Sequence, residues 1–549
     1  MSDNPEKSDE PARRVPVLIV GGSLVGLSTS LLLSSHGVQN MLVERHRGTA
    51  IHPRAASFHQ RTMEIFRSVG LQEAVEAAAE REFVQNGAII AVESLSGKEL
   101  KYFYRSFNTG VEDLSPTSRL FITQIGLEPL LRDRAQELGA EHHYATELVS
   151  FAQDDDGIVS VIRPRDGGPE QTVRSDYLVA ADGAHSLIRE KLGIEMLGRG
   201  SFADCVTIYF KADVREMIGD RNLSVVYVNH PDMLAFFRFS ITADSGFLAV
   251  FSINEDGTWN TNVGRDMDPA RCADYVRTAL GAAPDLPVEI DSVQRWSASA
   301  ACAETFQNGR IFLAGDSAHV MPPTGGFGGN TGVADAYNLA WKLAAVLNGT
   351  AGPGLLATYT PERRPASHLT VEQAYTRYVL RVDDSLPKDN LAAPLDDPSI
   401  ELGSIYRSPA VLGAAELTAQ DEPLDNPRTP TGALGVRAPH LPLERDGEPI
   451  STHDVVGTGF ALLAGSDGQP WCEAAAKAAA SLGVPLEAHR VGAGGRLGDQ
   501  GGAFESAFGI GAGGAVIVRP DAVLAWHSVG PVDDPVATLT DALTRLLFR

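Results

Sequence analysis

The stretch VLIVGGSLVGLSTSLLL, residues 17–33, decides the fold. An apolar run, VPVLIV at 15–20, leads directly into a glycine turn and then into a segment with leucines at helical spacing. This order predicts a buried parallel strand, a tight turn and a helix over 24–36, which Gly37 would end. A second apolar run at 40–44 completes a β-α-β unit. The sequence therefore predicts an α/β fold built on a parallel sheet.

The glycine turn departs from the dinucleotide fingerprint G-x-G-x-x-G, because Ser23 stands where the second glycine is expected. Gly21 permits the tight turn, Gly26 lets the helix pack on the strand, and the helix N-terminus offers N–H groups to a phosphate. Glu44 ends the second strand, where an acid accepts ribose hydroxyls. Ser23 could cap the helix or donate to a phosphate oxygen. This context favours a nucleotide site over a plain strand–turn–helix, while Arg45 could equally be a solvated charge.

Composition limits the function. The chain has 549 residues, enough for about two to four domains, and a formal net charge of −24 at pH 7. Nucleic acids and anionic membranes favour basic surfaces, so neither is expected as a partner. The four cysteines form no C-x-x-C pair, which predicts no metal site and a reducing, cytoplasmic compartment. No uncharged apolar run reaches about 18 residues, and none follows the start, so we expect neither a membrane span nor a secretory signal.

The pattern of polar and apolar residues changes along the chain. Runs such as VTIYFKADV (206–214) and LSVVYVNH (223–230) alternate in polarity, which predicts a largely antiparallel sheet. TGVADAYNLAWKLAAVL (331–347) has the apolar spacing of a strong helix. The expected boundaries are a disordered tail at 1–14, a nucleotide-binding domain at 15–82, 119–199 and 300–350, a substrate-covering domain at 83–118 and 200–299, a helical region at 351–385, a linker at 386–434 and a small α/β domain at 435–549.

Two later turns repeat the strand-then-glycine pattern. A strand ends at Asp182-Gly183, and another, IFLA, ends at Gly315-Asp316 before a Pro-Pro and glycine-rich loop. Each turn alone could be a plain loop. Three such turns in one chain favour a bound cofactor. The segment Gly328, Gly329 and Asn330 would then present backbone N–H groups at a helix start, which is suited to holding an anion.

Together these motifs resemble a known family. GGSLVG with Glu44, DGAHSLIR (182–189) and GDSAHVMPPTGGFGGN (315–330) follow the order and spacing of the single-component FAD-dependent aromatic hydroxylases of the p-hydroxybenzoate hydroxylase class. HPRAASFHQRTMEIFRSVGL (52–71) and VADAYNLAWKLAAVL (333–347) resemble the phenol and chlorophenol monooxygenase branch, which includes aromatic polyketide hydroxylases. The resemblance implies a Rossmann-like FAD-binding domain of the glutathione-reductase type. It also implies a mainly antiparallel substrate domain that interrupts it, and a C-terminal thioredoxin-like α/β domain, here without C-x-x-C.

The resemblance also implies the chemistry and the cofactor contacts. The expected activity is hydroxylation of a phenolic or polycyclic aromatic through a flavin C4a-hydroperoxide, with FAD as cofactor, NADPH or NADH as reductant and O₂ as oxidant. The implied FAD-binding residues are Gly21, Ser23, Leu24, Val25, Gly26, Glu44, Arg45, Arg54, Gln124, Leu148, Asp182, Asp316, Gly328, Gly329 and Asn330, and Pro323 is expected to pack over the flavin ring.

The substrate site is less determined by the sequence. A hydrogen-bond partner that favours the phenolate would help, because a phenolate donates electrons to the ring better than a phenol does. The candidates are His59, Tyr227, His230, Arg238 and Arg381, and for each a surface or packing role is an equal alternative. The alternatives in function are an antibiotic-modifying flavin hydroxylase, a flavin oxidase or reductase on the same fold, and a non-catalytic flavin-binding sensor. A small aromatic is the expected partner, and a homo-oligomer is compatible with this interpretation.

Overall fold

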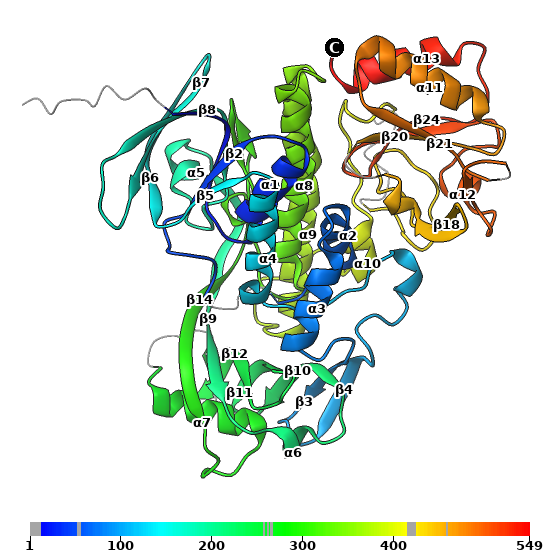
Figure 1. Ribbon diagram of the computed structural model, residues 1–549. Coiled ribbons are helices and arrows are strands. Elements are labelled where there is room, and N and C mark those ends of the chain that lie inside the picture. Colours follow the sequence, from blue (N-terminus) through cyan, green and yellow to red (C-terminus); the bar gives the residue numbers. More distant parts are fainter. Residues whose placement is uncertain are drawn as a thin grey trace, which may run out of the picture.

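Two long helices, α8 (Phe327–Leu347) and α9 (Tyr359–Arg381), run through the middle of the molecule (Figure 1). The computed structural model describes residues 13–51, 56–255, 258–260, 263, 267–413, 424–456, 459–492 and 494–549. The strong helix predicted over 331–347 is confirmed, but it begins at Phe327, in the glycine-rich segment that we expected to be a loop. The helix predicted over 24–36 is confirmed as α1 (Leu24–Ser35).

The first sheet carries the predicted β-α-β unit. Its strand order is β15-β16-β8-β1-β2-β5, parallel from β16 to β5, and β7 and β6 extend it through antiparallel pairs with β8. β1 begins at Arg13, where our expected tail would still continue, because Arg13 pairs with Val173 of β8. The strands are β1 (Arg13–Val20), β2 (Asn40–Val43), β5 (Glu141–His143), β6 (Thr146–Asp154), β7 (Gly157–Pro164), β8 (Gln171–Ala180), β15 (Gln307–Asn308) and β16 (Ile311–Leu313).

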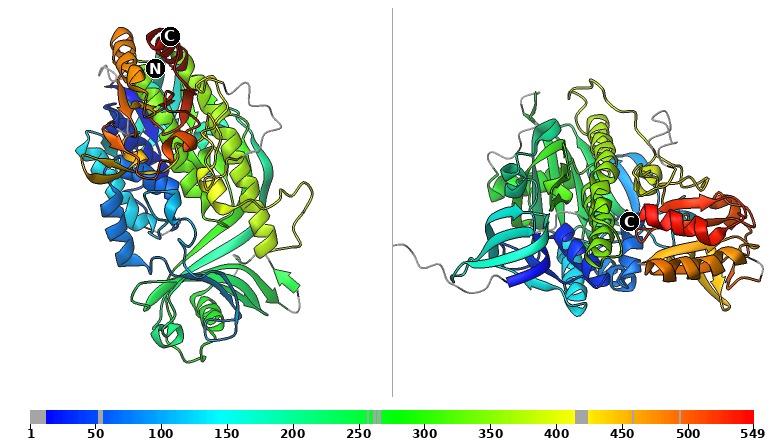
Figure 2. Two further views of the ribbon diagram at one scale, coloured as in Figure 1. Left: turned by 90° about the vertical axis from the view of Figure 1, so that its right-hand side faces the viewer. Right: turned by 90° about the horizontal axis from the view of Figure 1, so that it is seen from above.

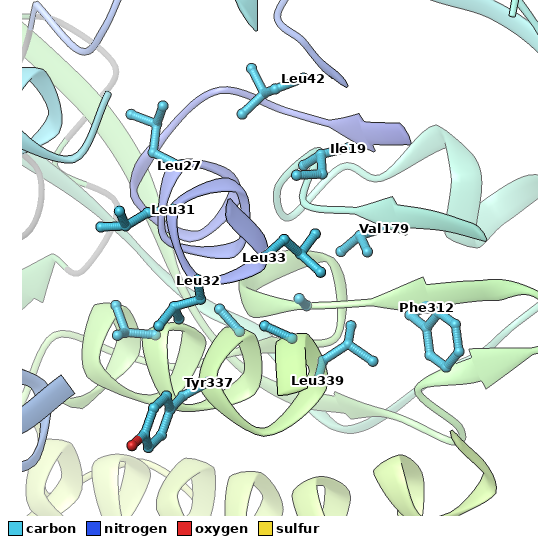
Figure 3. Close-up of a cluster of buried hydrophobic side chains, with 14 of the residues drawn as sticks. Ile19, Leu27, Leu31, Leu32, Leu33, Leu42, Val179, Phe312, Tyr337 and Leu339 are labelled. Atoms are coloured by element: carbon cyan, nitrogen blue, oxygen red, sulfur yellow. The ribbon is translucent and has the colours of Figure 1, made fainter. Parts of the chain in front are cut away.

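Helix α1 is buried between this sheet and α8. Its leucines at 27, 31, 32 and 33 are at most 2% exposed, because α1 lies between the strands of Ile19 and Val179 and the helix of Leu339 (Figure 3). Burial on both sides explains why the segment is apolar almost all round. The other helices near this sheet are α2 (Gln60–Ser68), α3 (Gln72–Glu82), α4 (Gln124–Glu137) and α5 (Leu187–Lys191).

The second sheet is mainly antiparallel, and one of its faces packs against helix α7. Its order is β17-β14-β9-β12-β11-β10-β3-β4, with β13 beside β12, and it is antiparallel except where β10 pairs with β3. Side chains such as Val226, Phe237 and Leu248 form an apolar core with α7. The elements are β3 (Ala88–Val92), β4 (Glu99–Tyr104), β9 (Met196–Lys211), β10 (Leu223–His230), β11 (Met233–Phe239), β12 (Ser245–Glu255), β13 (Thr258–Asn260), β14 (Glu289–Ala303), β17 (His319–Val320), α6 (Arg215–Ile218) and α7 (Pro269–Leu280).

The segment that we expected to be a linker, 386–434, contains a packed helix. In its described part α10 (Asp397–Leu402) begins with the N-cap Asp396, whose side chain accepts a hydrogen bond from the Ser399 N–H. Ile400 and Leu402 of this helix are buried. The expectation failed because Pro, Asp and Gly, which suggested a linker, also form helix caps and turns.

The C-terminal segment lies beside α8 and α9, at the end of the molecule away from the second sheet (Figures 1 and 2). A mixed sheet of order β21-β20-β23-β24 is accompanied by a smaller one of order β19-β18-β22. The elements are β18 (Pro442–Arg445), β19 (Glu448–Ser451), β20 (Phe460–Ala464), β21 (Leu486–Arg490), β22 (Leu497–Gly498), β23 (Ala515–Val518), β24 (Leu524–Ser528), α11 (Gln469–Leu482), α12 (Phe504–Ala507) and α13 (Pro535–Leu546). Among the helices of the described residues, none has the length and apolar character needed to cross a membrane.

Candidate active site

The glycines of the predicted nucleotide turn are required by close packing. Gly21 has φ +110°, a left-handed conformation, and a Cβ there would lie 2.1 Å from the carbonyl oxygen of Ala181. A Cβ on Gly26 would lie 1.9 Å from the carbonyl oxygen of Gly21. Ser23 is exposed, so a side chain is tolerated at the middle position. The turn therefore packs against the end of β8 although its second glycine is missing.

A carboxylate that sequence analysis missed lies at the N-terminus of α1. Glu128 of α4 accepts hydrogen bonds from the Leu24 N–H at 2.9 Å, the Ser23 hydroxyl at 2.6 Å and the Ala50 N–H at 2.6 Å. Gln124 Nε2 donates to Glu128 at 3.1 Å and to the Ser23 hydroxyl at 3.2 Å. Ser23 makes no side-chain cap, so our capping expectation was wrong. The Glu128 side chain therefore occupies the N-terminal end of α1, where the partial positive charge of the helix dipole favours a negative group.

Glu44 is buried at the carboxyl end of β2. Its carboxylate accepts a hydrogen bond from the Gly22 N–H at 2.6 Å. Its carbonyl oxygen accepts one from the Thr146 N–H at 2.8 Å, which brings the start of β6, and with it the half-buried Leu148, to the same corner. Arg45 is exposed beside it. Two of the residues predicted to bind FAD, Glu44 and Leu148, therefore lie close together although they are far apart in the sequence.

Val25 of the glycine turn packs against the turn that follows β16 and against the first part of α8. A Cβ on Gly315 would lie 2.7 Å from Cγ2 of Val25, and one on Gly332 would lie 2.4 Å from the same atom. Asp316 is exposed in the short turn that follows β16. Burial raises the pKa of Asp182, and Oδ1 of this residue is buried without a hydrogen-bond partner among the described residues. An acceptor in this state is suited to a hydroxyl of a bound cofactor.

The side chain of Asn330 joins α8 to the segment before α2. Its Oδ1 accepts hydrogen bonds from the His59 N–H at 2.9 Å and the Thr62 hydroxyl at 2.6 Å, and its Nδ2 donates to the Ser57 carbonyl at 3.0 Å. The predicted Arg54 lies outside the described residues, just before this segment. Because α8 begins at Phe327, the predicted positions 328–330 form its first turn, and the exposed Pro323 precedes it.

The face of the second sheet toward α9 is aromatic. Tyr227 packs against Phe103 with ring centroids 5.5 Å apart and against Phe236 at 5.9 Å. The Arg381 guanidinium of α9 lies 5.9 Å from the Phe103 ring. Burial raises the pKa of Tyr227, and the charge and hydrogen bond of Arg381 oppose that shift. The structure thus brings together two predicted residues that are far apart in the sequence.

Asp397, at the first position of α10, was not among our candidates. Its Oδ2 accepts a hydrogen bond from the Tyr104 hydroxyl at 3.0 Å, and its Oδ1 forms an ion pair with Arg377 of α9. Burial by itself would raise the pKa of Asp397, but the charge of Arg377 and these hydrogen bonds hold it below its ordinary value. The positive charge of the nearby Arg381 also lowers the pKa of Asp397. The Asp397 carboxylate in turn neutralises part of the positive charge of Arg377 and Arg381.

The other substrate candidates lie in different surroundings. His59 is buried before α2, with Nε2 3.1 Å from the Gly325 carbonyl oxygen and 3.9 Å from Glu401, and burial lowers its pKa. His230 lies three positions beyond Tyr227 on β10, on the other face of the strand, and its Nδ1 accepts a hydrogen bond from the Asp232 N–H. Arg238 lies on the same sheet face as Tyr227.

The arrangement fits a dinucleotide cofactor: a glycine turn without room for side chains lies at one edge of the sheet, together with a buried Asp182 oxygen that has no partner among the described residues. Comparison with known families agrees. The model described as "FAD binding domain" matches residues 14–374, and the model described as "Aromatic-ring hydroxylase, C-terminal" matches 431–549. The chain belongs to this family of FAD-dependent aromatic-ring hydroxylases, which confirms the resemblance inferred from the motifs.

Individual relatives cover nearly the whole chain. It is 49% identical to 4-methyl-5-nitrocatechol 5-monooxygenase of Burkholderia sp, over 98% of both chains. It is 39% identical to aklavinone 12-hydroxylase of Streptomyces purpurascens, over 97% of this chain and 99% of the relative. The crystal structure of aklavinone-11 hydroxylase with FAD and aklavinone superposes with a TM-score of 0.90 at 38% identity, covering 98% of this chain and 100% of that one. The protein is therefore a flavin-dependent aromatic monooxygenase that uses FAD, O₂ and a reduced nicotinamide.

Proposed function

We propose that the protein hydroxylates a phenolic ring that lies against the aromatic face of the second sheet, with Tyr227 and Arg381 in contact with the ring hydroxyl. The observation that carries the proposal is the approach of the Arg381 guanidinium to the partly buried Tyr227, beside the Phe103 ring. One relative is named for a nitrocatechol, a phenol with two hydroxyls, which supports a phenolic substrate.

FAD, once reduced by NAD(P)H, supplies the activation of O₂ for transfer of one oxygen atom to an electron-rich ring. The protein makes the ring electron-rich. A phenol hydroxyl beside Tyr227 would lie in the positive field of Arg381, which favours its ionised form. Asp397, which accepts a hydrogen bond from the Tyr104 hydroxyl, limits this positive field. It also holds Arg377 in place on α9, the helix that carries Arg381. The partly buried aromatic side chains of this face, Phe103, Tyr227 and Phe236, would limit the access of water to the reacting ring.

For the cofactor we propose that Glu44 binds the adenosine ribose. Ser23, Leu24, Val25 and Gln124 would line the pyrophosphate turn, and the first turn of α8 would face the flavin. The N-terminal partial charge of α8 suits the negative charge that a reduced flavin carries. Pro323 and Asp316 precede that helix and would flank the isoalloxazine and ribityl groups. The other implied FAD contacts are Gly21, Gly26, Arg45, Arg54, Leu148 and Asp182.

We also propose that residues 435–549 form a thioredoxin-like domain without redox function, after the FAD-binding domain at 15–82, 119–199 and 300–350 and the substrate domain at 83–118 and 200–299. The mixed sheet β21-β20-β23-β24 with α11 and α13 supports the assignment of the C-terminal domain. Cys472 lies in α11, and burial raises the pKa of its thiol, which disfavours a reactive thiolate.

The test is NADPH consumption by the FAD-loaded protein with and without a panel of phenols and catechols, combined with ¹⁸O₂ labelling. We expect substrate-stimulated oxidation and one labelled oxygen atom in the product. Tyr227→Phe should raise KM or uncouple NADPH oxidation from hydroxylation by about tenfold or more. Tyr102→Phe, on the outer strand β4, is the matched control. Unchanged kinetics and coupling in Tyr227→Phe would reject the role of Tyr227, and a protein that no phenol stimulates would reject the function.

A further inference from the structure

Arg238 on β11 is a buried arginine with very few polar partners. Its side chain is 6% exposed, and its guanidinium lies 4.0 Å from the centre of the Phe121 ring and 5.3 Å from that of Phe83. Nη1 donates a hydrogen bond to the Ala56 carbonyl at 2.6 Å, and the buried Nε has no partner among the residues that the structure describes. Stacking on two aromatic rings suits a guanidinium, but it leaves most of the N–H donors unused.

No carboxylate lies within ion-pair distance of Arg238 in the part of the chain that the structure describes. Other buried arginines differ, since Arg363 pairs with Asp335 and Arg519 pairs with Glu362. Burial lowers the pKa of Arg238 to about 9, which still leaves it charged at neutral pH. A buried charge without a counter-ion is strongly unfavourable for folding, so its presence indicates that a bound ligand supplies the negative charge.

Strand register places Arg238 on the same face of the second sheet as Tyr227. Tyr227 pairs with Phe236 across β10 and β11, and Arg238 follows Phe236 by two positions, so all three side chains lie on one face. The intervening Phe237 lies on the other face, in the core under α7. The Arg238 charge is close enough to oppose the burial-induced rise in the pKa of Tyr227.

The hydrogen bond of Arg238 joins this sheet face to the segment before α2. Its acceptor, Ala56, precedes Ser57, whose carbonyl oxygen accepts a hydrogen bond from Asn330 in the first turn of α8. Arg238 thus lies between the aromatic face that carries Tyr227 and the helix end assigned to the flavin. A ring held there would meet Arg238 in addition to the Tyr227–Arg381 pair.

We propose that Arg238 recognises an anionic oxygen on the aromatic substrate, a ring phenolate or carboxylate, and so selects ionised aromatics over neutral ones. The proposal rests on the proposed function, because it takes the aromatic face as the substrate pocket. The guanidinium would donate two N–H groups to the oxygen and be neutralised by it.

Direct binding to the FAD-loaded protein tests the proposal, followed through the flavin absorbance without turnover. The probes, slightly above neutral pH, are 4-nitrocatechol (a ring phenolate), 3,4-dihydroxybenzoate (a carboxylate) and neutral catechol. Arg238→Met should weaken binding of at least one anionic probe by about 30-fold or more and that of catechol by less than about threefold, and Arg238→Lys should recover part of the loss. The anionic probe that loses affinity identifies the oxygen. Arg215→Met, on the exposed helix α6, is the control.

An equal loss for all three probes, no loss, or a loss of FAD content would overturn the proposal. The last result would mean that Arg238 only holds the segment at Ala56. A shift in the flavin midpoint potential without a change in probe affinity would also overturn it, since the counter-ion would then be the flavin. Failure of the proposed function is seen separately, as a wild-type protein in which bound phenols do not stimulate NADPH oxidation.

Discussion

Arg519 and Arg238 are both buried arginines, and their surroundings are opposite. Arg519 follows β23 in the C-terminal segment and donates to Glu362 of α9 at 2.7 and 2.9 Å and to Asp521 at 2.9 Å. Lys342 of α8 donates to the same Glu362 at 2.7 Å. Two cations and two carboxylates therefore balance at an interface between the C-terminal segment and the central helices, whereas no described carboxylate pairs with Arg238.

The comparison shows that the partners of a buried charge distinguish a structural role from a ligand-binding role. In the Arg519 cluster each charge is paired, which holds the pKa of Glu362 well below and that of Arg519 above its ordinary value in spite of desolvation. Such a cluster is complete without a ligand. The surroundings of Arg238 are complete only when an anion binds, which is the arrangement expected of a recognition site.

Breaking the paired cluster should have the largest effect. Glu362→Gln removes the carboxylate that Arg519 and Lys342 share, and it should lower the free energy of unfolding by about 3–5 kcal/mol because two cations remain buried. Urea unfolding followed by tryptophan fluorescence measures this, since Trp341 lies 5.0 Å from the Arg519 guanidinium. Glu372, on the same helix as Glu362, forms a partly exposed ion pair with Arg199 of β9. Glu372→Gln should lower the free energy of unfolding by less than about 1 kcal/mol. Equal effects of the two substitutions would contradict a special role for burial.

The same substitution at both arginines compares them directly. Arg519→Met should lower the free energy of unfolding by about 3 kcal/mol, because Glu362 and Asp521 lose their shared partner. Arg238→Met should leave it within about 1 kcal/mol of wild type or raise it, because an uncompensated buried charge is removed together with a single hydrogen bond. Similar destabilisation by both variants would show that Arg238 is structural.

A pH titration extends the comparison to another buried contact of the C-terminal segment, where the His453 ring lies 3.9 Å from the Glu64 carboxylate of α2. Burial lowers the pKa of His453 to about 3. The unfolded chain then binds a proton near pH 6.5 that the folded chain does not bind, so stability falls as pH decreases below that value. Wild type should lose about 2 kcal/mol more than His453→Gln between about pH 7.5 and pH 5 in urea unfolding. Parallel pH profiles would place the loss at other groups.

Local patterns in the sequence predicted local structure well. The glycine turn, α1 and most of α8 follow from spacing that reflects the geometry of strands and helices. Strand β10 (Leu223–His230) has the residues of the predicted run. The motif resemblance, carried by three short turns, indicated the family and the FAD cofactor, and the family comparisons confirmed both.

Contacts between distant segments were not predictable in this way. Nothing near Glu128 in the sequence shows that its carboxylate lies at the start of α1, and Asp397 lies in a segment whose composition suggested a linker. The balance around a charge also depends on the whole fold. Arg238 and Arg519 each lie in or beside an apolar strand, and only their neighbours in space distinguish them.

The amino-acid sequence by itself determined the α/β class, the nucleotide turn with its tolerated Ser23, the family, and Tyr227 and Arg381 as substrate candidates. These depend on residue types at fixed short spacings or on motifs. The tertiary structure alone decided that Tyr227 and Arg381 meet, that Glu128 binds the α1 N-terminus and that α10 brings Asp397 to Arg377. It also decided that Arg238 has no counter-ion within the described part of the chain. The physical reason is that desolvation and charge pairing depend on which groups the folded chain brings within a few ångströms, whatever their separation in the sequence.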